Sequence, residues 1–184
     1  MLFLKKKGMF TVDIRVSPIL KEFIEAKWGS DTITLGKDDY FTQKIKHILQ
    51  RFPEDYVPVK PSERESYIRM EVKRVEFVRV GSKSLFEKLA QSAYLDSYLQ
   101  EQMAKELDKY FKEIFHAYVL AFCSARSFAD NCQRDGILDF CDVYNLKMNK
   151  VNFEMLKKSW YRSNEYQLFK KMREKLLRMA SFVS

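Results

Sequence analysis

The sequence predicts a predominantly helical α+β protein, in which a small N-terminal β/α region precedes a bundle of long helices that ends in a helix-turn-helix-like unit. Three observations support this fold class. Strand-like alternation of apolar and polar residues is confined to the first 80 residues, whereas helical spacing dominates from residue 84 onward. Apolar residues make up 46% of the chain, enough for a buried core. Only five Gly and four Pro occur among 184 residues, so we expect long regular elements in two regions, 1–80 and 81–184.

The N-terminal region begins with a half-buried strand at residues 11–17, where apolar and polar side chains alternate. Ser17 and Pro18 predict the start of a helix, with Ser as the N-cap and Pro at the first helical position, and Gly29 predicts its end. The alternation places Val12, Ile14 and Val16 on one face of the strand, and Thr11, Asp13 and Arg15 on the other.

Four further segments complete this region. Residues 30–37 predict a loop or short strand, and residues 38–52 predict an amphipathic helix that ends before Pro53. Residues 53–66 contain three prolines and indicate an extended connector. Residues 67–80 predict a second β region, with a bulge or turn where the alternation changes phase at Arg74 and Val75.

The second region is expected to be almost entirely helical from residue 84 to residue 180, without a strand between residues 95 and 128. Ser84 and Glu87 form a capping box, and a long helix or a helical pair follows, ending near residue 130. Its apolar row is most simply part of the core, and the alternative is the seam of a homodimer through residues 95–122. The row consists of Leu95, Leu99, Met103, Leu107, Phe111, Ile114, Tyr118 and Phe122.

The cysteines and histidines do not have the spacing of a metal site. Cys123, Cys132 and Cys141 are an odd number of cysteines without a CxxC pair, so we expect reduced thiols buried in the core. His47 and His116 lie among apolar neighbours in helical patterns. We therefore expect no metal.

The chain also lacks the motifs of common enzyme classes. It has no Gly-rich phosphate loop and no GxSxG nucleophile motif. Asp135 and Asp139 lie one helical turn apart and could hold a divalent ion, but the further acidic ligands of a nuclease site are missing. We therefore expect neither an enzyme nor a cofactor.

The start of the chain and its hydropathy bear on location. No run of 18 apolar residues predicts a membrane span. The first eight residues place apolar residues before basic ones, the reverse of a secretory signal, and Met9 is an alternative start. We therefore expect a cytoplasmic protein, most simply from a bacterium, a phage or another mobile element.

The basic charge is concentrated near the C-terminus. The formal net charge is +8. Residues 147–178 contain ten Lys or Arg and three Glu, a net charge of +7, which leaves about +1 for the rest of the chain. Such asymmetry favours a polyanionic partner contacted by one part of the chain, and the alternative is a solvated, Lys-rich helix face.

This basic stretch overlaps a helix–turn–helix pattern at residues 133–162. Asn145 stands where the chain must turn and tolerates the left-handed backbone conformation. Leu146 fills the corner, and Asn149 or Asn152 can cap the second helix. The first helix is expected to bury Ile137, Leu138, Phe140, Cys141 and Tyr144, and the second Phe153, Leu156 and Trp160.

On these residues the segment resembles helix-turn-helix DNA-binding proteins. In that family a small residue stands four positions before the turn residue, as Cys141 stands before Asn145, and an apolar residue follows the turn, as Leu146 does. The segment departs from the family pattern because Asn replaces the usual Gly and the turn is about two residues longer. Helical hairpins in ordinary cores give the same pattern, which is the alternative interpretation.

The resemblance and the charge together predict a non-enzymatic DNA-binding accessory or regulatory protein. Donors that suit phosphate oxygens and base edges gather on and after the second helix. The alternative is a structural or assembly protein that pairs through its long amphipathic helix. The predicted contact residues for double-stranded DNA are Lys150, Lys157, Lys158, Tyr161, Arg162, Asn164, Lys170 and Lys171.

A weaker resemblance lies at the N-terminus. A strand followed by a helix that opens with Ser17 and Pro18 is similar to ribbon-helix-helix repressors, which insert alternate strand side chains into the major groove. The resemblance implies contacts from Thr11, Asp13 and Arg15. The inserted segment at residues 30–37 is longer than that family has, and the alternative is an edge strand of a small sheet.

Overall fold

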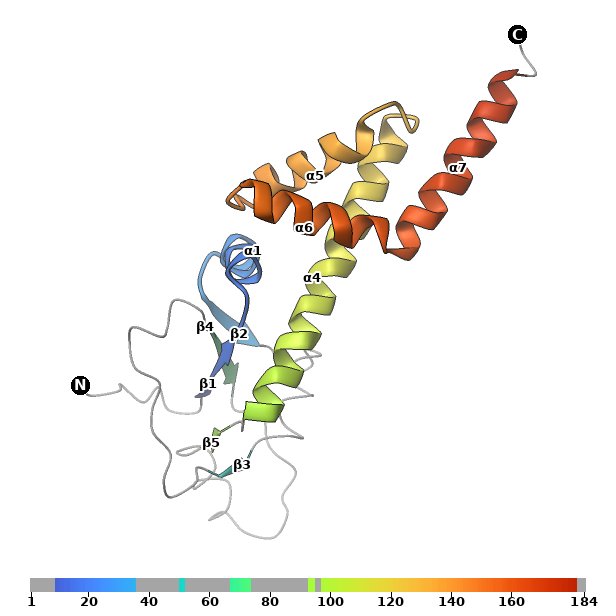
Figure 1. Cartoon of the computed structure of the whole chain (residues 1–184). Coiled ribbons are helices and arrows are strands. Elements are labelled where there is room, and N and C mark those ends of the chain that lie inside the picture. The colour runs from blue at the N-terminus through green and yellow to red at the C-terminus, as the bar shows by residue number, and fades with distance from the viewer. Residues whose placement is uncertain (1–8, 36–49, 52–66, 74–92, 95–96, 182–184) are drawn as a thin grey trace. The chain divides into compact units, whose positions relative to one another are not determined.

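The computed structural model describes residues 9–35, 50–51, 67–73, 93–94 and 97–181, and shows the predicted α+β fold with a predominance of helix (Figure 1). The chain divides into two compact units, Met1–Glu106 and Leu107–Ser184. The predicted division after residue 80 lies outside the described residues.

The first unit contains a three-stranded sheet in the order β1-β4-β2. Its central strand β4 (Tyr67–Lys73) pairs antiparallel with β1 (Met9–Arg15) and parallel with β2 (Thr32–Leu35). Ile14 lies opposite Ile68, and both are fully buried, which confirms the predicted phase of alternation in β1.

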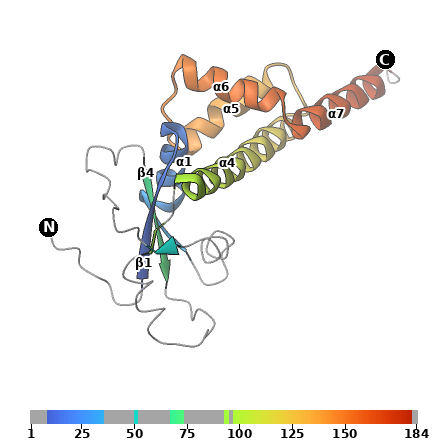
Figure 2. The same cartoon turned by 60° about the horizontal axis from the view of Figure 1, so that its bottom comes forward.

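Helix α1 (Pro18–Trp28) follows β1 directly, as predicted (Figure 2). Pro18 occupies the first turn, and Gly29 ends the helix in the left-handed conformation, with a φ of 71°. Ser17 is the N-cap in extended conformation, but its side chain makes no capping hydrogen bond. The helix buries Ile19, Leu20, Phe23 and Ile24, whereas Trp28 is half-buried.

Two predictions for this unit were wrong at particular residues. Gln50–Arg51 form β3, so the helix expected at residues 38–52 does not extend to its predicted end. Ala93–Tyr94 form β5, which pairs antiparallel with β3, although strands were expected only before residue 80. Each strand has two residues and is defined by a partner more than forty positions away, which local periodicity cannot reveal. The remainder of the predicted helix 38–52, the connector 53–66 and the Ser84–Glu87 capping box lie outside the described residues.

The long helix α4 (Ser97–Ala125) confirms the absence of a strand between residues 97 and 128, but its buried row differs from the prediction. Met103, Leu107 and Phe111 are buried as expected. Beyond Phe111 the buried residues lie one position later than the predicted row, whose last three members are half-buried. Residues four apart turn about 40° around a helix at each step, so the buried face changes along α4. The observed continuation is Phe115, Val119 and Cys123, in place of Ile114, Tyr118 and Phe122.

The second unit consists of the end of α4 with α5 (Cys132–Val143), α6 (Lys150–Tyr161) and α7 (Asn164–Ser181). Its centre is aromatic. The Phe140 ring on α5 lies 5.0 Å from Phe115 and 6.0 Å from Phe111 on α4, centroid to centroid. Gly136 lets the α5 backbone approach α4, because a Cβ there would lie 3.1 Å from the Phe122 ring.

The three cysteines are free thiols, and all three are buried. Burial, together with a hydrogen bond to Cys132, raises the pKa of Cys123 above its ordinary value and disfavours the reactive thiolate.

A thiol reagent is therefore expected to label the native protein slowly and the unfolded protein at all three sites. Rapid native labelling of two or three thiols, followed by mass spectrometry, would contradict this assignment.

Candidate nucleic-acid interface

The corner between α5 and α6 has the backbone geometry predicted from the sequence. Asn145 adopts the left-handed conformation with a φ of 47°. The Leu146 N–H donates to the Cys141 carbonyl at 2.8 Å, and both side chains are buried. The small residue before the turn and the apolar residue after it therefore fix the corner.

Helix α6 begins with a side-chain cap. Asn149 Oδ1 accepts from the Asn152 N–H at 2.8 Å, and Asn152 Nδ2 donates to the Lys147 carbonyl at 2.7 Å. Both candidate caps thus contribute, one as the N-cap and the other by holding the turn. Leu156 and Trp160 anchor the helix in the core, whereas Phe153 is only half-buried.

The arrangement also departs from the family pattern. Helix α6 begins five residues after Asn145, so the turn is long, as the sequence indicated. Figures 1 and 2 show α5 and α6 running in opposite directions on either side of the corner that joins them. The long turn separates this unit from the family pattern, whereas its charges suit a polyanionic partner independently of the motif.

Helix α6 leads directly into α7 through Ser163, which the sequence pattern placed on the exposed face of the second helix but which is buried. Its hydroxyl donates to the Trp160 carbonyl at 2.7 Å and accepts from the Tyr166 N–H at 3.0 Å. The second bond caps α7. Ser is a preferred N-cap residue, and Ser163 stands between the end of α6 at Arg162 and the start of α7 at Asn164.

The exposed ridge of α6 differs between its two halves. Val151, Met155, Lys158 and Arg162 follow at spacings of four, three and four residues and lie on one face. Val151 is 77% exposed and Met155 is 41% exposed, so the first half of the ridge is apolar. The basic groups lie at the C-terminal half. In a helix-turn-helix protein it is the N-terminal residues of the recognition helix that contact bases.

The structure separates Lys157 from the other predicted contacts. Lys157 and Lys158 lie about 100° apart around the helix. Lys157 is half-buried, and its Nζ lies 3.6 Å from Glu154 Oε1, so a carboxylate already compensates its charge. Lys158 and Arg162 are exposed and form no ion pair with a described carboxylate.

The remaining predicted DNA contacts lie at the start of α6, at its end and on α7. Lys150 is exposed in the first turn of α6, and Asn164 is exposed at the start of α7. Tyr161 is 43% exposed, and its ring packs edge-to-face on Tyr166 at 4.8 Å. On α7, Lys171 is exposed, and Lys170 places its Nζ 5.1 Å from the Tyr166 ring centroid.

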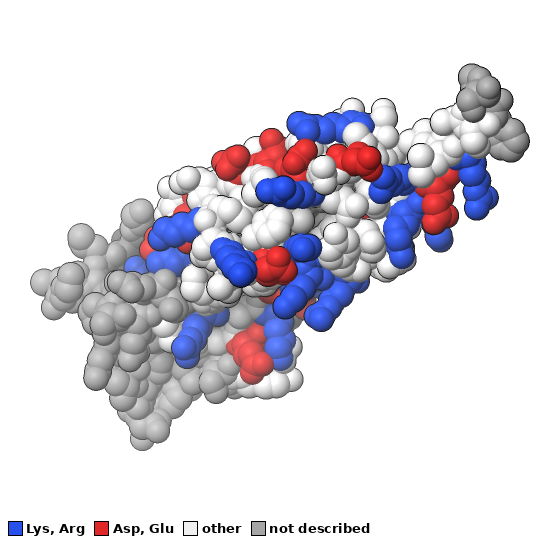
Figure 3. All heavy atoms as spheres, turned by 45° about the horizontal axis from the view of Figure 1, so that its top comes forward, with Lys and Arg blue, Asp and Glu red and all other residues white. Residues whose placement is uncertain are grey.

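Charge is distributed unevenly over the helices of the second unit. Helix α5 carries three Asp and one Arg, a net charge of −2. Helix α6 carries three Lys and one Glu, a net charge of +2, and α7 carries five basic and two acidic residues, a net charge of +3. Figure 3 shows several acidic side chains close together along one edge and mostly basic ones along α7. The basic charge therefore belongs to α6 and α7.

Helix α4 shows the opposite behaviour, since its lysines are compensated within the helix. Lys105 pairs with Glu101 at 2.7 Å, Lys112 pairs with Asp108 at 2.5 Å, and Lys109 lies 3.9 Å from Glu113. On α6 and α7, by contrast, several exposed basic residues make no ion pair with any described carboxylate. These residues are Lys150, Lys158, Arg162, Lys171, Lys175 and Arg178.

Polar contacts inside the unit hold α4, α6 and α7 in place, and sequence reasoning missed them. His116 Nε2 lies 2.9 Å from Ser159 Oγ, and His116 Nδ1 lies 3.7 Å from Glu165 Oε2. Burial lowers the pKa of His116, and the nearby Glu165 carboxylate opposes that effect. Trp160 Nε1 donates to Gln133 Oε1 at 2.9 Å. These contacts join residues 27 to 49 positions apart, so no short motif encodes them.

Two of the three acidic residues of α5, Asp139 and Asp135, have side-chain partners within the chain. The Tyr118 hydroxyl donates to Asp139, and this bond together with burial raises the pKa of Tyr118 to about 12. Asp135 pairs with Arg126 at 3.4 Å. Among the described residues no group of three potential metal ligands occurs.

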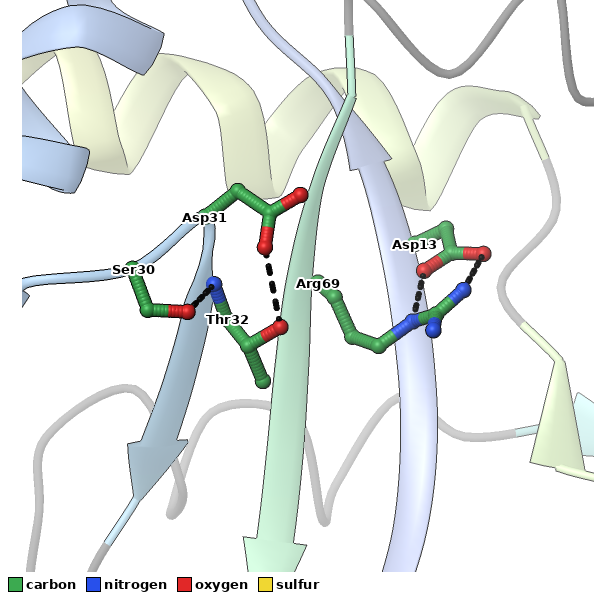
Figure 4. Close-up of polar contacts among 5 residues, drawn as sticks. All are labelled: Asp13, Ser30, Asp31, Thr32 and Arg69. Atoms are coloured by element: carbon green, nitrogen blue, oxygen red, sulfur yellow. Dashed lines mark hydrogen bonds and ion pairs between the residues drawn. The ribbon is translucent and has the colours of Figure 1, made fainter. Parts of the chain in front are cut away.

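The N-terminal candidate surface is an edge of the sheet, as the alternative interpretation had it, since β1 pairs within the chain with β4. Figure 4 shows Asp13 facing Arg69 across the two strands, with distances of 2.9 Å from Nε to Oδ1 and 3.2 Å from Nη2 to Oδ2. This pair raises the pKa of Arg69. Arg15 is exposed, and the Thr11 side chain lies outside the described part. Asp13 therefore stabilises the pairing of β1 with β4 through Arg69.

Comparison with protein families, with curated proteins and with solved structures finds no match for this chain. Among the described residues, no helix has the length and apolar character needed to span a bilayer.

Proposed function

We propose that this protein is a non-enzymatic, cytoplasmic DNA-binding accessory or regulatory protein, which holds duplex DNA against α6 and the start of α7. The observation that carries the proposal is the group of exposed basic residues on these two helices that form no ion pair with a described carboxylate, in contrast to the paired lysines of α4. Exposed Lys and Arg that release counterions from phosphates supply most of the affinity of such proteins for duplex DNA. A phage or another mobile element is the origin that we propose.

Lys158 and Arg162 are the centre of the proposed contact. They lie one turn apart on the exposed ridge, and the buried Leu156 and Trp160 fix the opposite side of the helix. Lys158 is expected to contact phosphate, and Arg162 to reach a base edge or a phosphate. The apolar first half of the ridge has no donors for bases, so we expect modest sequence preference.

The alternative of an assembly protein that pairs through α4 has less support. The apolar row of α4 is buried or half-buried within the chain, and Tyr98 is the one large apolar side chain among the described residues of α4 that is strongly exposed. A homodimer through residues 95–122 therefore has little apolar surface available on this helix.

Charge reversal at Lys158 and Arg162 tests the proposal. The double variant Lys158→Glu/Arg162→Glu is expected to weaken duplex binding by about tenfold or more at about 50–100 mM salt. Each lost phosphate contact should also lower the slope of log K against log salt by about 0.9. Fluorescence anisotropy with a labelled duplex across a salt series measures both quantities. Reversal of Lys157 and Lys158 should have a smaller effect, because Glu154 already pairs with Lys157.

The matched control is Lys105→Glu/Lys109→Glu on α4, which makes the same change in net charge at exposed positions one turn apart. It should leave duplex affinity within about threefold of the wild-type value, since binding by net charge alone is weak and non-specific. Equal effects of the two double variants, or no effect of the α6 variant in a folded protein, would show that α6 is only a solvated surface.

A further inference from the structure

Helix α7 carries several exposed apolar side chains that the proposed DNA contact does not use, whereas Met172 on the same side is half-buried. Leu168, Met172, Leu176 and Met179 follow at spacings of four, four and three residues, so they line one side of the helix. Phe169 is the residue of α7 that is buried. Leu176 is 42% exposed and Met179 is 56% exposed. A surface helix normally turns such a stripe toward a partner.

The apolar surface of α7 is broad. Leu177 is strongly exposed and lies about 100° around the helix from Leu176, on the side away from Leu168. Apolar residues thus extend around the helix from Leu168 to Leu177, interrupted by Arg173, which pairs with Asp130, whereas the seam of a two-stranded coiled coil is a narrow stripe. A flat surface accommodates such a width better than a single partner helix does.

Basic residues border the apolar half. Lys171, Lys175 and Arg178 each precede a stripe residue by one position and are exposed. Long Lys and Arg side chains can extend their stems along an apolar surface and keep the charge at its polar boundary. Together with the stripe, this pattern is typical of helices that lie in the plane of a membrane interface.

Two other possible partners, a second copy of α7 and duplex DNA, match the charges and the apolar stripe of α7 less well. A second copy of α7 would bring together two helices that each carry a net charge of +3, and like charges oppose association. Duplex DNA offers phosphates to the lysines but no continuous apolar surface to the stripe. The complementary surface must be both anionic and apolar.

From this combination we infer that α7 docks on an anionic membrane surface, with the exposed Leu168, Leu176 and Met179 inserted and Lys171, Lys175 and Arg178 among the lipid headgroups. The apolar stripe of α7 has no part in the DNA-binding proposal, whereas Lys171, Lys175 and Arg178 belong to the basic charge that both proposals use.

Vesicle sedimentation with the full-length protein tests the inference. At about 100 mM salt the protein should sediment with phosphatidylcholine vesicles that contain about 30% phosphatidylglycerol, and only weakly with pure phosphatidylcholine. The variant Leu176→Gln/Met179→Gln should lower partitioning by at least about tenfold, because it removes two exposed apolar side chains while keeping good helix formers. The variant Lys175→Gln/Arg178→Gln should lower it by about fivefold for each charge removed.

The matched control is Val151→Gln, which removes a strongly exposed apolar side chain from α6 and should leave vesicle binding unchanged. Circular dichroism and duplex affinity of Leu176→Gln/Met179→Gln should equal those of the wild type. The inference is overturned if the wild type does not sediment with anionic vesicles, or if that variant binds them as well as the wild type. It is also overturned if the variant instead abolishes a concentration-dependent dimer, since a second copy would then be the occupant.

Discussion

Replacement of Trp160 by Ala is expected to lower the free energy of unfolding of the second unit by about 3–5 kcal/mol. Trp160 is fully buried, so the change leaves a large cavity between α6 and its neighbours. It also leaves Gln133 without the 2.9 Å hydrogen bond from the indole. Urea denaturation followed by far-ultraviolet circular dichroism measures the loss, and the effect on duplex binding should follow the loss of folded protein.

Tyr161→Ala is the matched control for Trp160. It removes an aromatic side chain from the next position of the same helix, but Tyr161 is exposed and loses mainly its contact with Tyr166. We expect a cost of about 0.5–1.5 kcal/mol. A loss below about 2 kcal/mol for Trp160→Ala would mean that α6 is not anchored in the core as described.

The second large effect is expected at Phe140. Its ring lies within 6.0 Å of four other aromatic rings, and it is fully buried. Phe140→Ala should therefore cost about 3–5 kcal/mol and open the contact between α4 and α5. The four neighbouring rings belong to Phe111, Phe115, Tyr118 and Tyr144.

This prediction has an independent readout, because Cys141 is adjacent to Phe140 and Cys123 is buried on α4. Thiol labelling of the folded variant should be faster than that of the wild type. Leu138→Ala, at a half-buried position of the same helix, should cost clearly less than Phe140→Ala. Equal destabilisation by both variants would contradict the central place of Phe140 in the core.

Features that depend on local sequence were predicted well. Pro18 and Gly29 delimit α1, Asn145 turns the chain, and Asn149 caps α6, because each residue type has a strong intrinsic preference for its position. The concentration of basic residues on α6 and α7 also follows directly from the sequence. The sequence does not show which of these charges are paired. Lys157 forms an ion pair with Glu154 of the same helix, whereas Lys158 forms none with a described carboxylate.

Features that depend on distant partners could not be predicted. The buried face of the second half of α4 packs on α5, where the Phe140 ring lies 5.0 Å from that of the buried Phe115. A wide apolar surface allows either phase, and periodicity alone cannot select one. The pairing of β3 with β5 is likewise invisible to a local pattern.

The separation of an acidic α5 from the basic α6 and α7 gives the second unit a permanent electric dipole moment. A dipole experiences a torque in the field of a polyanion before any contact forms. Near the duplex DNA that we propose as the partner, the unit would be oriented during diffusion, with its basic helices turned toward the negative surface and α5 turned away. Productive encounters would then be more frequent than random collisions, and the advantage would fade once the Debye length falls below the size of the unit.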